Sequence, residues 1–215
     1  MFTLIPDDIE AYCESHSSQE DSILYQLYRE THLKIPRPRM ICGHSQGLFL
    51  EMMSRIIRPK RILELGTFTA YATICLAKGL DKDGIIYTIE GNPELCPIIT
   101  KYLKKAEIES KAKLLIGQAL DIIPTLHETW DIVYIDADKV NYLNYYKMLI
   151  PALSNHGILL VDNVLWNGKI SKKIQDTDKD TKAISEFNDY VQNDSRVKNL
   201  LLPLRDGIMV VQKIN

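Results

Sequence analysis

The spacing of apolar residues changes near Pro59, and this change divides the chain into two parts. Before Pro59, apolar residues recur every three or four positions, as in Leu48, Met52 and Ile56, which is typical of helices. The two prolines of the segment 35–38 interrupt this region. We therefore expect a single domain in which a helical N-terminal extension over residues 1–58 precedes a core over residues 60–215.

After Pro59, short apolar runs alternate with helical patterns. The runs predict buried strands at residues 61–65, 84–89, 113–116, 132–135 and 157–161. Helices are expected between them, at residues 69–78, from Asn92-Pro93 onward, at 120–126 and at 142–153. This alternation predicts an α/β fold with a Rossmann-like, doubly wound and mostly parallel sheet that has helices on both faces.

The end of the chain departs from this alternation. Two apolar runs, 198–203 and 208–213, are joined near Asp206-Gly207, and Asp-Gly is a strong hairpin signal. We therefore expect the sheet to finish with an antiparallel pair. The polar stretch 171–182 and then a helix are expected before this pair. The sequence leaves open whether the polar stretch is a flap over a site or a plain surface loop.

Composition and charge narrow the class of protein. The formal net charge of −2 gives no basic footprint for nucleic acid, and the lysines between 101 and 113 are interpreted as a solvated helix face. The four cysteines are far apart, so neither a disulfide framework nor a zinc site is predicted. No apolar run approaches the ~20 residues of a membrane span, and no signal peptide is apparent. We expect a cytoplasmic protein that binds no membrane.

Polar side chains follow the fourth and fifth predicted strands directly. Asp136-Ala137-Asp138-Lys139 comes after the run 132–135, and Asp162-Asn163 comes after the run 157–161. Ligands of such sheets bind outside the carboxyl ends of the strands, so these side chains are expected to converge. Carboxylate and amide oxygens suit Mg²⁺, Mn²⁺ or Ca²⁺ better than Zn²⁺. The alternative, a set of helix caps with a surface ion pair, is less consistent with this many polar residues at successive strand ends.

The turn after the first strand carries a single glycine, Gly66. A dinucleotide fingerprint would have three glycines, but Thr67, Phe68 and Ala70 fill the neighbouring positions. This pattern argues against NAD or FAD and suits a nucleoside ligand without phosphates. Glu64, just before the turn, is placed to meet a ligand ammonium, and the helix start that follows suits a ligand carboxylate.

Residues at two further strand ends are expected to bind the rest of this ligand. Glu90 ends the second strand, where an acidic residue accepts both ribose hydroxyls, although a helix-capping carboxylate is the alternative interpretation. The segment Gly117-Gln118-Ala119 follows the third strand, where an adenine edge would lie. An amino acid joined to an adenosine without phosphates describes S-adenosylmethionine (SAM).

Four motifs carry a resemblance to a known family. They are 63–71 (LELGTFTAY), 134–142 (YIDADKVNY), 161–168 (VDNVLWNG) and the terminal Asp206-Gly207. These segments closely resemble the cation-dependent class I O-methyltransferases, the family of caffeoyl-CoA O-methyltransferase and, more distantly, of catechol O-methyltransferase. The match runs from about Met40 to the C-terminus.

The resemblance implies a role for individual residues. It implies a divalent cation held by Asp136, Asp162 and Asn163, with Lys139 acting beside the acceptor hydroxyl and Asp136 sharing the catalytic centre. Trp166 would line the acceptor pocket with Lys139, although a core or dimer contact is an equal alternative for this tryptophan. The cofactor-binding set comprises Met40, Glu64, Gly66, Thr67, Tyr71, Ala72, Glu90, Gly117, Ala119 and Asp136. The family also suggests a homodimer.

Two segments depart from the family pattern. The family usually has Gly-Tyr-Ser where this chain has Ala70-Tyr71-Ala72, so a methyl group is added and a hydroxyl is lost near the cofactor. The upstream family pattern Glu-Gly-Gln is Gln46-Gly47-Leu48 here. We expect weaker or rearranged cofactor contacts.

The expected activity is methyl transfer from SAM to a hydroxyl of a vicinal-diol aromatic molecule. A phenol with a pKa of about 10 is a poor nucleophile at neutral pH, so a cation and a proton acceptor such as Lys139 would activate it. A nicotinamide dehydrogenase lacks support because the glycines are missing. A nucleic-acid N-methyltransferase would have an Asp/Asn-Pro-Pro-Tyr motif in place of residues 136–139. A non-catalytic SAM-binding sensor or scaffold is the remaining alternative.

Overall fold

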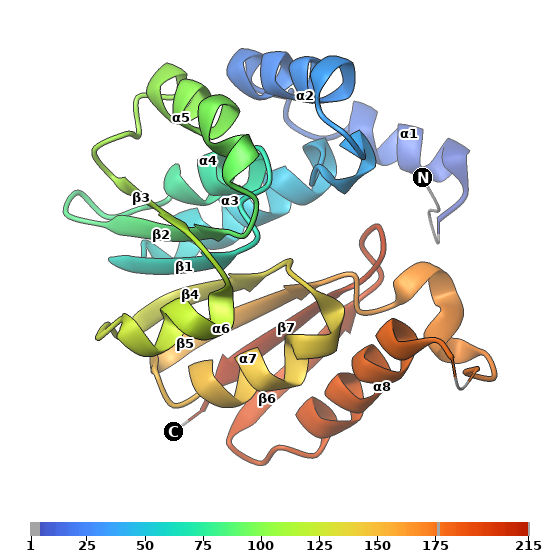
Figure 1. Ribbon diagram of the computed structural model, residues 1–215. Helices are drawn as coiled ribbons and strands as arrows, with labels where there is room; N and C mark the ends of the chain where they lie inside the picture. The colour runs from blue at the N-terminus through green and yellow to red at the C-terminus, as the bar shows by residue number, and fades with distance from the viewer. Residues whose placement is uncertain (1–4, 176, 215) are drawn as a thin grey trace. The chain divides into compact units, whose positions relative to one another are not determined.

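The computed structural model describes residues 5–175 and 177–214, which form two compact units (Figure 1). The first unit spans Asp8–Leu126, and the second comprises the described residues from 127 onward together with residues 5–7. Among the described residues, no helix is both long enough and apolar enough to cross a membrane.

The N-terminal region is helical, as its apolar spacing predicts. It comprises α1 (Asp7–Ser15), α2 (Ser22–Lys34), the 3₁₀ turn η1 (Pro38–Met40) and α3 (His44–Ile57). The prolines separate α2 from α3 as expected, but the break between α1 and α2 was not predicted. It is stabilised by Asp21, whose carboxylate accepts a hydrogen bond from the Ile23 amide at 2.8 Å and so caps α2.

Three parallel strands form the sheet of the first unit in the order β3-β2-β1. They are β1 (Arg61–Leu65), β2 (Ile85–Glu90) and β3 (Ala112–Ile116). The connecting elements are α4 (Tyr71–Ala77), η2 (Pro93–Leu95), α5 (Cys96–Lys105), α6 (Ala119–Ile122) and η3 (Ile123–Thr125). Helix α2 packs against both α4 and α5, and α3 packs against α4. The strand bounds agree with the apolar runs to within one residue.

The contact between α3 and the α4 region is unusually close because glycines lie in it. A Cβ atom added to Gly47 would lie 2.6 Å from Cε1 of Tyr71 and 2.9 Å from Sγ of Cys75. A Cβ atom added to Gly79 would lie 2.2 Å from the carbonyl carbon of Ser54. Ser54 is buried and donates its hydroxyl to the Leu76 carbonyl at 2.6 Å. The absence of a Cβ atom at Gly47 and Gly79 therefore allows α3 to pack this closely against the α4 region.

The second unit contains four strands in the order β4-β5-β7-β6. Its elements are β4 (Trp130–Ile135), η4 (Lys139–Asn141), α7 (Tyr142–Leu149), β5 (Leu153–Asp162), η5 (Trp166–Ser171), α8 (Lys179–Gln192), β6 (Val197–Leu202) and β7 (Ile208–Lys213). Strands β4 and β5 are parallel, whereas β7 pairs antiparallel with both β5 and β6. The predicted C-terminal hairpin is therefore confirmed.

Helices α7 and α8 pack against each other in this unit (Figure 1). The ring of Phe187 meets the rings of Tyr142 and Tyr146 edge-on, with centroid distances of 5.8 and 5.9 Å. All three side chains are buried. This aromatic cluster fixes α7, and with it the segment that carries Lys139, against α8.

Three predicted boundaries were wrong. The helix expected over 142–153 ends at Leu149, because Pro151 has no amide hydrogen with which to continue the helical hydrogen bonds. Strand β5 consequently begins at Leu153 rather than at 157. In the polar stretch 171–182, α8 already begins at Lys179, where the Asp178 carboxylate accepts from the Thr181 amide at 3.1 Å. Position 176 of that stretch lies outside the described residues.

The four cysteines are all free thiols. Cys42 and Cys75 are buried in the first unit, and Cys96 is partly buried. Cys13 on α1 is exposed. Burial raises the pKa of the Cys75 thiol, so this cysteine is an inert core side chain.

Candidate active site

The glycine turn of the first unit has a strained backbone. Gly66, Phe68 and Ala70 have φ angles of 96°, 49° and 73°, so three residues lie in the left-handed region. The amides of Gly66 and Thr67 both donate to the Ile89 carbonyl, at 3.0 and 3.2 Å, which folds the turn back onto the end of β2. The left-handed φ angle of Ala70 explains why glycine suits this position, since this conformation costs an alanine ~1–2 kcal/mol.

Glu90 lies against this turn because β2, which it ends, pairs with β1. One carboxylate oxygen accepts from the Phe68 amide at 2.8 Å, and the other accepts from the Asn92 amide at 2.8 Å. The residue is only 8% exposed. Each carboxylate oxygen has a second acceptor site, so the ribose role of Glu90 is compatible with both contacts and stays a prediction.

Glu64 lies beneath the turn and is 0% exposed. Its Oε2 atom accepts from the hydroxyls of Thr73 and Thr88, at 2.5 and 2.6 Å. The Thr88 hydroxyl also lies 2.5 Å from that of Thr67. This hydrogen-bond network stabilises the turn, so Glu64 and Thr67 have a structural role that the sequence did not predict. The contact of Glu64 with a ligand ammonium stays a prediction.

The remaining predicted cofactor residues differ in exposure. Met40 is 53% exposed at the end of η1, whereas Tyr71 and Ala72 are buried at the start of α4. The Tyr71 hydroxyl donates to Glu20 Oε1 at 2.5 Å, a partner that sequence reasoning missed because it lies in a non-periodic linker. Burial raises the pKa of Tyr71, so the phenol stays protonated.

Gly117 and Ala119 lie next to Glu90 along the strand ends. The Gly117 amide donates to the Glu90 carbonyl at 2.9 Å, and Gly117 has a φ of 148°. Ala119 is the first residue of α6 and is buried. The structure therefore brings the predicted adenine-edge segment to the ribose-binding candidate, within the first unit.

The polar residues of the second unit converge on Lys139. Its ammonium donates to Asp136 Oδ1 at 3.0 Å, to Asn163 Oδ1 at 2.8 Å and to the Tyr142 hydroxyl at 2.5 Å. Only 11% of the Lys139 side chain is exposed. The pairing of Ile135 with Val161 in β4 and β5 puts the two strand ends side by side, which explains this convergence.

Asp162 is more deeply buried than Asp136 and Asn163 and is 2% exposed. Its Oδ2 atom accepts from the Tyr134 hydroxyl at 3.1 Å, and its Oδ1 atom accepts from the Asn163 amide at 2.7 Å. The Asp162 carbonyl accepts from the Tyr142 hydroxyl at 2.9 Å. Burial, assisted by the Asp136 and Asp162 carboxylates, raises the pKa of Tyr142, so this phenol remains a donor.

The donor set fits a hard cation. The oxygens of Asp136 and Asn163 already share one positive group, the Lys139 ammonium, and a third oxygen donor, Asp162, precedes Asn163 directly. Among the described residues, no group of three or more His, Cys, Asp or Glu side chains forms a metal site. The predicted ligand set contains two carboxylates, Asp136 and Asp162, and one amide, Asn163. The divalent cation therefore stays a prediction.

Aromatic rings flank the same lysine. The Lys139 ammonium lies 4.8 Å from the centroid of the Tyr142 ring and 5.8 Å from that of Trp166. Trp166 is only partly buried and has a φ of 47°. The structure thus places Trp166 beside Lys139, and its role in lining an acceptor pocket stays a prediction.

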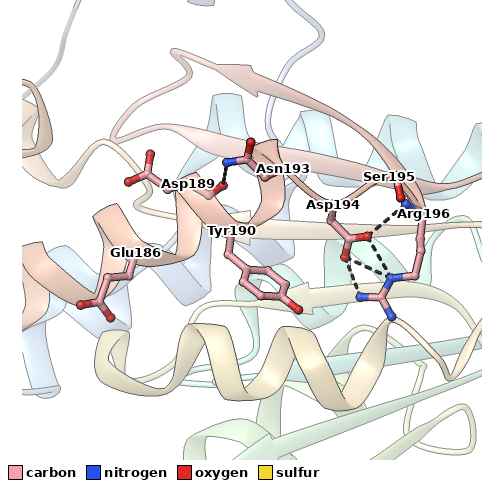
Figure 2. Close-up of a pocket in the computed structure, with 7 residues that line it drawn as sticks. All are labelled: Glu186, Asp189, Tyr190, Asn193, Asp194, Ser195 and Arg196. Carbon is pink, nitrogen blue, oxygen red and sulfur yellow. Dashed lines mark hydrogen bonds and ion pairs between the residues drawn. The ribbon is translucent and has the colours of Figure 1, made fainter.

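A hollow of about 700 Å³ lies at the end of α8 and holds none of the predicted site residues (Figure 2). Its polar groups are engaged with one another: Arg196 donates to Asp194 at 2.6 Å, and Asn193 donates to the Asp189 carbonyl at 2.7 Å. The bond from Arg196 lowers the pKa of Asp194 to about 2, so its carboxylate is charged and fixed. These contacts close the helix end and order the turn into β6.

Comparison with known proteins decides the family. The model of the O-methyltransferase family matches residues 14–214 of the chain. The chain belongs to the O-methyltransferase family. The predicted resemblance to the caffeoyl-CoA O-methyltransferase group is thereby confirmed, since relatives with that name align over most of the chain.

Individual relatives of this O-methyltransferase extend the comparison. Caffeoyl-CoA O-methyltransferase 1 of Nicotiana tabacum is 31% identical over 201 residues, which cover 87% of this chain and 83% of the relative. The SAH-bound methyltransferase PaMTH1 of Podospora anserina is 26% identical with a TM-score of 0.89, and the match covers 100% of both chains. The O-methyltransferase TomG of Streptomyces achromogenes, involved in tomaymycin synthesis and solved with SAM, is 25% identical with a TM-score of 0.87 over 97% of this chain and 96% of that one. The predicted Rossmann-like fold class is confirmed.

Proposed function

We propose that this O-methyltransferase moves the methyl group of SAM to a hydroxyl of a vicinal-diol aromatic molecule with the help of a divalent cation. The observation that carries the proposal is the convergence of Lys139, Asp136 and Asn163 at neighbouring strand ends. A cofactor-binding protein without catalysis would need no buried lysine among oxygen donors, and this argues against the sensor or scaffold alternative.

The first unit supports SAM as the cofactor. Its turn offers one glycine, its Glu90 carboxylate lies against the turn, and its Gly117 amide binds the end of β2. These features suit a nucleoside without phosphates, and relatives of this fold have been solved with SAM or SAH. When bound, SAM supplies the electrophilic methyl group.

The second unit supports an oxygen nucleophile. Three polar contacts fix the Lys139 nitrogen in one place. An acceptor hydroxyl beside it would meet a positioned nitrogen, which can take the hydroxyl proton once the ammonium has itself lost a proton. Trp166 and Tyr142 give the lysine two aromatic neighbours and favour a planar acceptor. A bound divalent cation, held by Asp136, Asp162 and Asn163, would stabilise the phenolate form of the acceptor.

The same proposal includes the assembly and location of the protein. We propose a homodimer in the cytoplasm, as the family resemblance suggests, with Mg²⁺ as the first cation to test before Mn²⁺ and Ca²⁺. No nucleic-acid partner is proposed, because the formal net charge is −2.

A methyl-transfer assay tests the function directly. The protein is incubated with labelled SAM and a panel of catechol-type and caffeoyl-type acceptors, first with Mg²⁺, then with excess EDTA, and then with Mg²⁺ restored. We expect transfer that EDTA abolishes and Mg²⁺ restores. A monophenol and a singly methylated catechol serve as control acceptors, because neither presents two adjacent free hydroxyls.

Each other result has a clear meaning. Transfer that survives EDTA would refute the cation while keeping the O-methyltransferase. Equal transfer to the monophenol would refute the vicinal-diol acceptor. SAM binding measured by calorimetry, with no transfer to any acceptor, would favour the sensor or scaffold alternative.

Replacing Glu90 tests the cofactor side separately. Glu90→Ala removes the acceptor of the Phe68 and Asn92 amides and the proposed acceptor of the ribose hydroxyls. Hydrogen bonds to charged groups contribute about 1.5–3 kcal/mol, so we expect SAM to bind roughly 10- to 100-fold more weakly in a calorimetric titration. Glu94→Gln, an exposed change on η2, is the matched control and should leave the affinity unchanged. Unaltered affinity in a folded Glu90→Ala protein would exclude the ribose role.

A further inference from the structure

The loop that follows β5 has an unusual backbone. Asn163, Trp166, Asn167 and Gly168 have φ angles of 59°, 47°, 54° and 69°, so the left-handed region recurs within one short segment. Such conformations cost free energy in residues other than glycine and persist only where the surroundings hold them. The loop also carries Asn163, which contacts Lys139, and Trp166, whose ring lies beside it.

The turn between β6 and β7 holds one side of this loop. The Val164 amide donates to the Gly207 carbonyl at 3.1 Å, and the Leu165 amide donates to the Asp206 carbonyl at 2.9 Å. The Asn167 amide donates to the Asp206 carboxylate at 2.5 Å. A Cβ atom added to Gly207 would lie 2.4 Å from Cγ of Leu165, so the two segments are in close contact.

Helix α8 also binds the backbone of this loop. The Asn188 side chain donates to the Val164 carbonyl at 2.9 Å. The Val164 amide and carbonyl are therefore both bound, one by the hairpin turn and the other by α8. Two elements later in the chain, the turn between β6 and β7 and helix α8, therefore both bind the backbone of this loop.

Asp206 is partly buried and feels the charge of the candidate catalytic lysine. Burial raises the pKa of Asp206, whereas its bond from the Asn167 amide and the charge of Lys139 lower it. Its side chain therefore belongs to the electrostatic surroundings of Lys139, although its hydrogen bond is to the loop. Asp206 therefore binds the loop through the hydrogen bond from the Asn167 amide, and it influences Lys139 only through its charge.

We propose that Asp206 and Asn188 are positioning residues, which hold the loop Asn163–Gly168 in its left-handed conformation and so place Asn163 and Trp166 beside Lys139. The hydrogen bond accepted by Asp206, rather than its charge, is the decisive contact. The catalytic consequence of this clamp rests on the proposed O-methyltransferase function, but the clamp itself does not.

Hydrogen–deuterium exchange tests the clamp without any substrate. In Asp206→Ala, we expect amide exchange in residues 164–168 to rise at least tenfold, while exchange in β5 stays unchanged. Asp206→Asn keeps an oxygen that accepts from the Asn167 amide and should stay within about threefold of the wild type. Asp180→Ala, an exposed change at the start of α8, is the matched control and should change nothing.

Kinetics then test the consequence. Misplacement by about 1 Å costs up to ~10²-fold in rate, so Asp206→Ala should lower kcat about 10- to 100-fold and leave SAM affinity unchanged. Asp206→Asn should restore most of kcat. Asn188→Ala carries the same two measurements if Asp206→Ala fails to fold.

Two results would overturn the proposal. Unchanged exchange in residues 164–168 of folded Asp206→Ala would show that the carboxylate does not hold the loop. An Asp206→Asn protein as impaired as Asp206→Ala would show that charge, and not the accepted hydrogen bond, matters. If the wild type methylates no acceptor, the proposed function fails, but the exchange measurement still decides for or against the clamp.

Discussion

Replacing Lys139 with methionine should lower kcat for methyl transfer by about 10²- to 10⁴-fold, which is the usual contribution of a positioned acid or base. The substitution keeps an unbranched apolar side chain as far as Cε and removes the amine held by Asp136, Asn163 and Tyr142. SAM affinity should fall much less than kcat, because every predicted cofactor-binding residue except Asp136 lies in the first unit, whereas this amine lies in the second. Steady-state kinetics and calorimetry measure the two quantities.

A second substitution separates the two roles that the lysine can have. Lys139→Arg keeps a positive charge but cannot lose its proton at any ordinary pH. If the lysine accepts the acceptor's proton, arginine should restore little of the lost rate. If the lysine only supplies charge, arginine should restore most of it. Lys147→Met, an exposed change on α7, controls for loss of a lysine, and a full rate in Lys139→Met would remove Lys139 from the mechanism.

The largest loss of stability is expected for Gly79→Ala. The added Cβ atom would lie 2.2 Å from the carbonyl carbon of Ser54 and 2.3 Å from the Arg55 nitrogen, both of which are backbone atoms that cannot rotate away. Helix α3 must therefore move, and overpacking of this kind costs about 3 kcal/mol at the upper end of the usual range. A protein of this size should lose roughly 6–12 °C in Tm.

A matched glycine provides the control. A Cβ atom added to Gly91 would have its nearest contact at 3.6 Å, to Nε2 of Gln118, which is ordinary van der Waals distance. Gly91→Ala should therefore change Tm by no more than about 2 °C, since surface substitutions usually stay within ±0.5 kcal/mol. Similar thermal unfolding of the two variants would show that the contact between α3 and Gly79 yields without cost.

The strand ends were predictable because they follow from local rules. Strand β1 lies where its apolar run placed it, and the adjacency of β4 and β5 brings Asp136 and Asn163 to one lysine. The hairpin at Asp206-Gly207 was predictable from its turn residues. Apolar periodicity and turn chemistry therefore located both candidate sites along the chain.

The supporting contacts were not predictable, because they join residues that share no sequence pattern. Glu20 binds Tyr71 across 51 positions, and Asn188 binds the Val164 carbonyl across 24 positions. A single polar side chain in a linker or on a helix face has no period to mark it. The end of α7 was misjudged for a different reason, since apolar residues continue past the helix and outweighed the proline signal at Pro151.

The exposure of the four thiols has a practical consequence for labelling. Of the four cysteines, all within the described residues, only Cys13 is exposed, whereas Cys42 and Cys75 are buried. A maleimide dye at neutral pH should therefore attach first to α1, without any engineered cysteine. The native sequence thus offers a single fluorescent reporter on its N-terminal helix. The same thiol will cross-link two molecules under air, so measurements of assembly state need a reducing agent.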